Sequence, residues 1–66
     1  MSDGYVQIKY TNYRQVTAIR TILPGRIWFG TTKRHPQPQW LLDAFDVDKQ
    51  EHRSFAMADI SSWEAR

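Results

Sequence analysis

The sequence predicts a small all-β barrel of five antiparallel strands, and three observations support this fold class. Apolar and polar residues alternate through several short segments, β-branched and aromatic side chains concentrate there, and turn-forming residues separate the segments at close spacing. The 66 residues are expected to form one domain, residues 1–66, without a linker, an internal repeat or a low-complexity tract. Closing the sheet into a barrel would remove the exposed edges that such a small sheet otherwise carries.

The first two strands are expected at residues 5–10 and 15–23. "YVQIKY" alternates apolar and polar residues with the period of two that is typical of a half-buried strand. "TNYR" follows as a turn, because asparagine tolerates positive φ and hydrogen-bonds to nearby backbone. "QVTAIRTIL" is β-branched and apolar, and we expect it to end at Pro24-Gly25, a pair that strongly breaks regular structure.

The third and fourth strands are expected at residues 26–32 and 39–46. "RIWFGTT" carries the third strand and "QWLLDAFDV" the fourth. Between them "KRHPQPQ" is predicted to be a loop, because His35 and Gln37 each precede a proline and are pushed towards extended backbone.

The fifth strand is expected at residues 51–58, after a turn formed by "DVDKQE". The tail "DISSWEAR" is expected to form one short helical turn, capped by Asp59 or Ser61. The core is predicted to centre on seven apolar residues: Val6, Ile8, Ile27, Phe29, Leu42, Phe55 and Ile60.

Composition excludes several classes of protein. The chain contains no cysteine, so it has neither a disulfide framework nor a thiolate metal site. No apolar run approaches the roughly 20 residues that a membrane helix needs. The N-terminus "MSDGY" has neither the basic nor the apolar segment of a signal peptide. A cytoplasmic protein is the expectation.

The net charge of +2 is unevenly distributed along the chain. Residues 1–36 hold six Lys/Arg and one acidic residue, whereas residues 37–66 hold three Lys/Arg and six acidic residues. A positive half can attract phosphates or another polyanion. The alternative is that the two halves interleave in the barrel and their charges mix on its surface.

Catalysis is not expected. No serine lies in a pattern with histidine and a carboxylate, and His35 and His52 lack a metal-ligand spacing. The acidic residues around the "DVDKQE" turn lack the ligand order and the central glycine of a calcium loop. Glycine-rich phosphate-binding motifs are absent as well. We therefore predict no catalytic residues, no metal and no cofactor.

Two arginines within predicted strands stand out as candidate binding residues. Arg20 lies inside the second strand, and Arg53 lies two residues before Phe55 and so on the same face of the fifth. A guanidinium cannot lose its charge and is costly to bury without a partner. The alternative to a ligand is a structural ion pair with Asp43 or Asp59, or a side chain that reaches out to solvent.

The order of these features resembles the WYL domain, an Sm-like or SH3-like β-barrel found in many bacterial transcriptional regulators. The resemblance covers roughly residues 5–62. It rests on "IKY" (8–10), "RTILP" (20–24), "QWLLDAFD" (39–46) and "RSFAMADI" (53–60). Each motif is short, and their common order and spacing carry the match.

The chain departs from the family pattern in two ways. Leu41 stands where the family has the tyrosine of its name-giving triplet. We also expect the winged-helix DNA-binding domain that usually precedes the barrel to be absent, because the first strand is predicted at residue 5. The resemblance therefore implies a stand-alone ligand-sensing barrel, encoded by a phage or a small operon, that does not bind duplex operators as full-length regulators do.

The resemblance also implies a ligand. In the family, the barrel is thought to bind a nucleotide or a single-stranded oligonucleotide through a basic and aromatic patch, in transcriptional or phage-defence regulation. Arginine forks fit phosphates and aromatic rings stack on bases, which agrees with that partner. Arg20, Arg53, Tyr10 and Trp40 carry over from the family, and the charge of the loop adds Lys33, Arg34 and His35.

A protein-interaction module is the alternative function. Trp28, Trp63 or an open strand edge could pair with another subunit or with a partner protein. Sm-like barrels commonly assemble by edge pairing, and so small a chain gains stability from association. Salt dependence separates the two functions, because binding of nucleic acid weakens steeply as salt rises.

Overall fold

The computed structural model describes residues 4–65, which form one antiparallel sheet of five strands and a single 3-10 turn. Neighbouring strands follow the order β4-β3-β2-β1-β5. The predicted all-β class and the count of five antiparallel strands are confirmed. The elements are β1 (Val6–Thr11), β2 (Thr17–Gly30), β3 (Gln39–Asp46), β4 (Glu51–Ala56), the 3-10 turn η1 (Met57–Asp59) and β5 (Ile60–Ala65).

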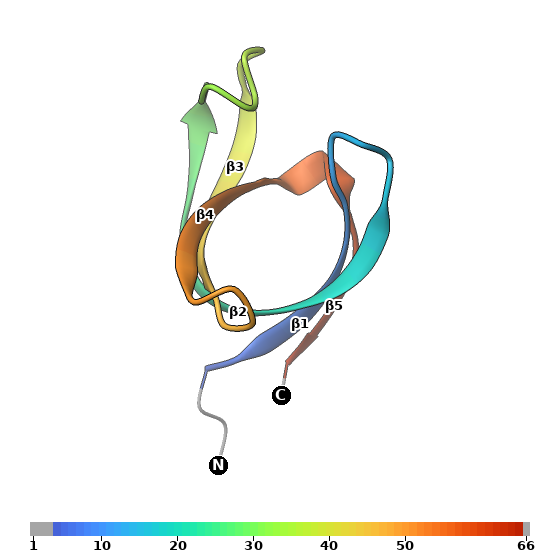
Figure 1. Ribbon diagram of the computed structural model, residues 1–66. Helices are drawn as coiled ribbons and strands as arrows, with labels where there is room; N and C mark the ends of the chain where they lie inside the picture. The colour runs from blue at the N-terminus through green and yellow to red at the C-terminus, as the bar shows by residue number, and fades with distance from the viewer. Residues whose placement is uncertain (1–3, 66) are drawn as a thin grey trace.

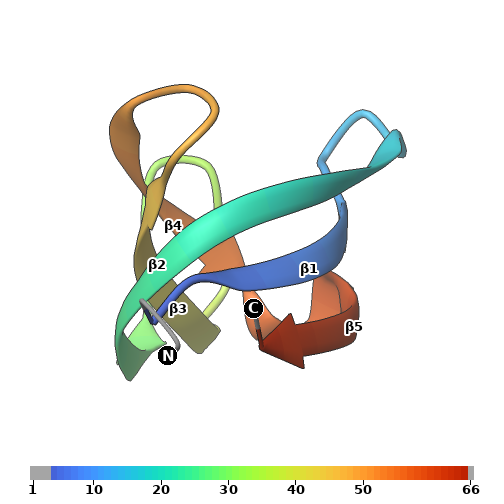
Figure 2. The same ribbon diagram turned by 90° about the horizontal axis from the view of Figure 1, so that it is seen from below.

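Strand β2 is continuous, so the predicted break at Pro24-Gly25 is wrong. Its first half pairs with β1 and its second half with β3, and the sheet curls strongly along this strand (Figures 1 and 2). The register with β3 shifts between Pro24 and Arg26, which is a bulge. A Cβ atom at Gly25 would lie 2.8 Å from the carbonyl oxygen of Asp43. Pro24-Gly25 therefore bends the strand and does not end it.

The tail differs from the prediction as well. The predicted fifth strand ends at Ala56, the single helical turn is η1, and residues 60–65 form β5 along β1, with Trp63 opposite Ile8. Arg66, the last residue of the predicted tail, lies outside the described residues. No side chain caps η1, so neither Asp59 nor Ser61 has the predicted capping role. Pairing with β5 satisfies backbone groups on the second edge of β1, which would otherwise lack partners.

The core lies on the inner face of the curled sheet. Ile60 is partly buried against it. Ile27 and Phe29 were predicted in the core but are 55% and 57% exposed, because the second half of β2 and the start of β3 form a hairpin that projects beyond the other strands (Figure 1). Four predicted core residues are confirmed as buried (Val6, Ile8, Leu42 and Phe55), and Tyr10, Ile22 and Ala44 join them.

Strands β4 and β5 stand at the two ends of the strand order, and no β4–β5 pairing is recorded within residues 4–65. In the same part of the chain, no helix has the length and apolar character to cross a membrane.

Candidate functional site

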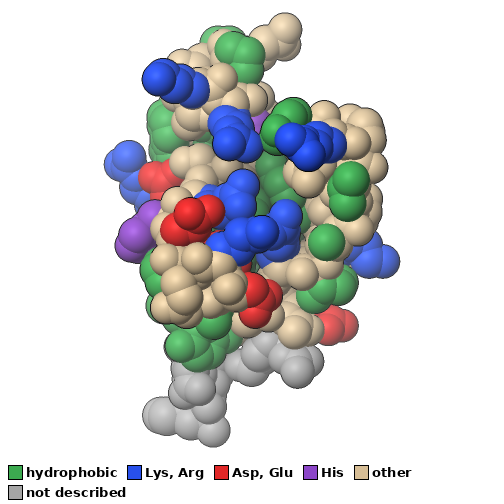
Figure 3. All heavy atoms as spheres, viewed as in Figure 1, with side chains coloured by type: hydrophobic (Ala, Val, Ile, Leu, Met, Phe, Trp, Pro, Cys, Tyr) green, Lys and Arg blue, Asp and Glu red, His purple; other side chains and the backbone are tan. Residues whose placement is uncertain are grey.

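A cleft of about 330 Å³ opens beside the inner face of the sheet. It lies between the β1–β2 turn, the loop after β2, and β4. Figure 3 shows Lys and Arg side chains gathered across the middle of one face of the molecule, with acidic side chains interspersed. Six of the seven residues predicted for the site line this cleft: Tyr10, Arg20, Lys33, Arg34, His35 and Arg53.

Trp40 is the predicted site residue that lies elsewhere. It is 57% exposed on β3, opposite Phe29 of β2, and the two rings meet edge to face with centroids 5.3 Å apart. The pair belongs to the projecting hairpin, so Trp40 does not line the cleft. The prediction that Trp40 neighbours the two arginines is not supported by this geometry.

The basic loop is held against the cleft by a tight turn. Thr32 and His35 exchange backbone hydrogen bonds of 2.9 and 3.1 Å, and the His35 N–H also lies 3.0 Å from the Thr32 hydroxyl oxygen. The two ring nitrogens of His35 lie 3.1 Å from Thr32 Oγ1 and 3.5 Å from the Tyr10 hydroxyl. These contacts fix the rim that carries Lys33 and Arg34.

Tyr10 connects this rim to the core. Its ring is buried and meets Phe55 edge to face, with centroids 4.9 Å apart. Its hydroxyl oxygen accepts a hydrogen bond of 3.1 Å from the buried N–H of Ala56. Burial raises the pKa of the Tyr10 hydroxyl, since the charged phenolate is poorly solvated there. Tyr10 is thus a supporting residue in the wall of the cleft.

Replacing Tyr10 with phenylalanine tests this role. Tyr10→Phe keeps the ring packing but leaves the Ala56 N–H without its acceptor, so we expect the free energy of unfolding to fall by about 1–2 kcal/mol. Urea unfolding measures the change. Tyr13→Phe is the matched control, because that exposed ring should change stability by less than about 0.5 kcal/mol. Equal stability of Tyr10→Phe and the unmodified chain would contradict the role of the hydroxyl.

Arg20, which lines the cleft, forms an ion pair with the buried Asp46. The Nη1 to Oδ2 distance is 3.6 Å, and the side chains are 17% and 0% exposed. The register of β2 and β3 explains why Asp46 is the partner of Arg20. Asp46 lies opposite Ile22, and Ile22 and Arg20 share a face of β2. The ion pair predicted as an alternative for Arg20 is present, but its partner is neither Asp43 nor Asp59.

Arg53 is held more loosely. Its Nη1 lies 3.5 Å from Oε1 of Glu51, and the two side chains are 31% and 58% exposed. The two residues are two apart on β4 and therefore share a face of that strand. Among residues 4–65, Glu51 is the one acidic residue that lines the cleft, against four Lys or Arg residues. An anion entering the cleft would compete with Glu51 for Arg53.

Tyr13 also lines the cleft, although it was not among the predicted site residues. Its ring is 65% exposed, and the guanidinium carbons of Arg14 and Arg34 lie 5.6 and 5.3 Å from its centroid. A hydrogen bond from Arg14 and the charges of both arginines lower the pKa of the Tyr13 hydroxyl. Tyr13 therefore offers an exposed aromatic face within a cationic rim. Its place within a predicted turn, next to Arg14, is the signal that could have identified it.

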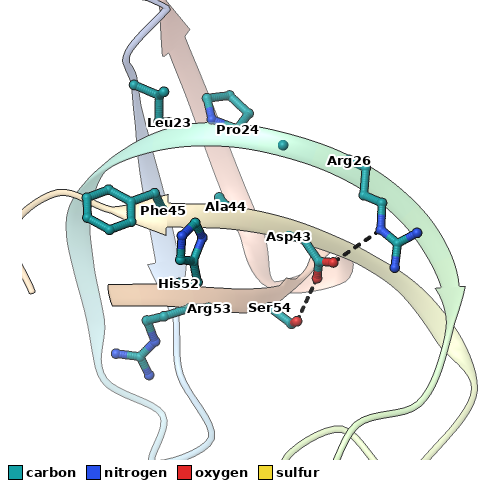
Figure 4. Close-up of a pocket in the computed structure, with 10 residues that line it drawn as sticks. Leu23, Pro24, Arg26, Asp43, Ala44, Phe45, His52, Arg53 and Ser54 are labelled. Atoms are coloured by element: carbon teal, nitrogen blue, oxygen red, sulfur yellow. Dashed lines mark hydrogen bonds and ion pairs between the residues drawn. The ribbon is translucent and has the colours of Figure 1, made fainter. Parts of the chain in front are cut away.

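A second depression of about 620 Å³ lies beside the bend of β2 (Figure 4). Asp43 accepts hydrogen bonds there from Ser54 (2.7 Å), Trp28 (2.9 Å) and Arg26 (3.3 Å). The bonds from Ser54 and Trp28, followed by that from Arg26, lower the pKa of the Asp43 carboxyl. These contacts tie β2, β3 and β4 together, which makes this network a structural one.

Comparison of the chain with models of protein families, with curated proteins and with solved structures gives no match. Within residues 4–65, the His, Asp and Glu side chains form no cluster of three or more that could hold a metal ion.

Proposed function

We propose that this chain is a regulatory or ligand-sensing module that binds a nucleotide or single-stranded nucleic acid in the cleft. The observation that carries the proposal is the convergence of four Lys or Arg side chains on one cleft, whose described lining contains a single acidic residue. Arg20 and Arg53 come from β2 and β4, and Lys33 and Arg34 come from the loop after β2. Such an arrangement favours a ligand with more than one negative charge.

Phosphate esters suit this set of donors. A guanidinium presents paired N–H groups that match two phosphate oxygens, and Arg53 is the more available of the two strand arginines. Tyr13 offers a ring on which a base can stack, a contact worth roughly 1–3 kcal/mol. The cleft volume of about 330 Å³ lies at the small end of the range for ligand sites, which favours one nucleotide unit over a duplex.

The fold we propose is an Sm-like or SH3-like barrel of the WYL type. The strand order β4-β3-β2-β1-β5, the long bent β2 and the 3-10 turn before β5 support a sheet that curls on itself. The Arg-x-Phe pair of the resemblance, Arg53 and Phe55, lies on β4, where both residues line the cleft and the phenylalanine also belongs to the core. This placement supports the role that the resemblance implies for Arg53.

Salt dependence tests the proposal. We expect a fluorescently labelled single-stranded oligonucleotide to bind at low salt and to weaken steeply as salt rises, because condensed counterions are released on binding. Fluorescence anisotropy measures the binding curves. The same oligonucleotide in duplex form is the control and should bind less tightly. No binding of single strands or mononucleotides at low salt would contradict the proposal.

A protein-interaction module is the second candidate, and exposed aromatic residues favour it. Trp40 and Phe29 are 57% exposed and Trp63 is 46% exposed, each on or beside a strand that could take a partner. Association through such surfaces should depend little on salt, in contrast to binding in the cationic cleft. Both surfaces can exist on one chain, because Phe29, Trp40 and Trp63 do not line the cleft.

A further inference from the structure

The second half of β2 is an open strand edge. The ladder between β1 and β2 ends at the pair Val6–Ile22, whereas β2 continues to Gly30 with only β3 beside it. Among residues 4–65, no strand pairs with the other edge of residues 26–30. In an antiparallel ladder, alternate residues direct their N–H and C=O groups away from the partner, so this edge can pair with a further strand.

The side chains of the same segment form an exposed apolar surface. Ile27 and Phe29 alternate on one face of β2, and Trp40 lies across from Phe29 on β3. The three side chains are 55–57% exposed, and Phe29 and Trp40 pack edge to face. An exposed strand with these residue types is a template for pairing with another extended segment.

We propose that this edge binds a second copy of the chain, by antiparallel pairing of residues 26–30 with the same residues of the other copy about a two-fold axis at Trp28. This register sets Ile27 of each copy opposite Phe29 of the other, a favourable β-branched and aromatic pair. Arg26 falls opposite Gly30, so no like charges face each other. The surface is therefore complementary to itself, as a two-fold interface requires.

The expected affinity follows from the size of the surface. The exposed parts of Ile27, Phe29 and Trp40 amount to roughly 300–400 Å² of apolar surface per copy. Edge pairing covers only part of it, because the partner strand lies beside Ile27 and Phe29, whereas Trp40 lies on β3, on the far side of β2. A stable interface of standard size buries about 800 Å² per partner. Backbone pairing along five residues adds to the apolar contact, so we expect a reversible dimer with a dissociation constant of roughly 10–500 µM. The inference does not depend on the proposed ligand.

The molar mass of nuclease-treated protein, measured by light scattering and sedimentation from about 1 µM to about 1 mM, tests for a dimer with an interface of this size. We expect a monomer at the low end, a dimer at the high end, and little change when salt is raised. Phe29→Lys should raise the dissociation constant by at least about tenfold. Ile19→Lys is the matched control: Ile19 is 54% exposed on the same strand, but lies in the half that pairs with β1. A monomer throughout, or a dimer indifferent to Phe29→Lys, would overturn the inference.

Cysteine crosslinking tests the register, and the absence of native cysteine leaves no competing thiol. Ile27→Cys and Phe29→Cys proteins should form a disulfide-linked dimer when mixed, because the two positions face each other across the proposed axis. Each variant alone should crosslink far less. Equal crosslinking in the mixture and in the separate proteins would overturn the proposed pairing, as would no crosslinking at concentrations where the unmodified chain dimerises.

Discussion

Replacing Asp46 with alanine is expected to lower the free energy of unfolding by about 3–5 kcal/mol, a large share of the total stability of so small a chain. Asp46 is fully buried and lies 3.6 Å from Arg20, and its Oδ1 accepts the N–H of Lys49 in the turn after β3. Removing the carboxylate strands a guanidinium that is 17% exposed, and breaking a buried pair in this way costs about 3–5 kcal/mol. A chain of this length has a total stability of roughly 3–10 kcal/mol.

The Arg20–Asp46 pair leaves part of its hydrogen-bonding capacity unused, which suggests a second variant for the same experiment. Arg20 Nε and Asp46 Oδ2 are buried without a hydrogen-bond partner among the described residues. Replacing both charges with apolar side chains of similar size, as in Arg20→Met with Asp46→Leu, should therefore restore much of the stability that Asp46→Ala loses. Circular dichroism with urea unfolding measures all three proteins.

Asp48→Ala is the control for the Asp46 experiment, because Asp48 is an exposed carboxylate in the same turn. It should change the free energy of unfolding by less than about 0.5 kcal/mol. If Asp46→Ala were as stable as Asp48→Ala, the ion pair would contribute nothing to the fold, and Arg20 would be free to serve a ligand alone.

Local patterns were sufficient to locate most of the sheet. Alternation in the sequence placed strands at residues 5–10 and 39–46, and the structure has them at Val6–Thr11 and Gln39–Asp46. This agreement has a physical basis, because a strand with one buried face must alternate. The same rule identified Val6, Ile8, Leu42 and Phe55 as core residues.

The errors come from features that depend on distant parts of the chain. Pro24-Gly25 signals a break locally, but the register with β3 turns it into a bulge within β2. The tail was predicted to be a helical turn because of its capping residues, whereas residues 60–65 pair with the open edge of β1 and form β5. Ile27 and Phe29 are apolar and alternate, yet they are exposed, because they lie on the part of the β2–β3 hairpin that projects beyond the other strands.

Most residues of the candidate site were predicted from the sequence, but the contacts that they make were predicted less well. Seven residues were predicted together on charge and resemblance, and the fold brings six of them, from the loop and from three strands, to one cleft. Their partners were not all predictable. Asp46 required the register between β2 and β3, whereas Glu51 could have been identified from its spacing of two residues from Arg53 on one strand.

The geometry separates the two roles that the sequence left open for Arg53. A structural role would require a buried carboxylate partner, whereas Glu51 is 58% exposed and the distance is 3.5 Å. Exposed pairs of this kind contribute about 0–1 kcal/mol to stability. Arg53→Ala and Arg53→Lys should therefore fold, with free energies of unfolding within about 1 kcal/mol of the unmodified chain.

Binding by these folded variants is the decisive measurement for the cleft. We expect Arg53→Ala to weaken binding of a single-stranded oligonucleotide by roughly tenfold to a hundredfold, the equivalent of one charge-assisted hydrogen bond to phosphate. Arg53→Lys keeps the charge but loses the paired N–H groups of the guanidinium, so its affinity should lie between those of the unmodified chain and Arg53→Ala. Glu51→Gln should tighten binding, because the competing carboxylate is removed. Arg26→Ala is the matched control, since Arg26 also pairs with a carboxylate but does not line the cleft. If Arg53→Ala bound as tightly as Arg26→Ala, Arg53 would be removed from the site.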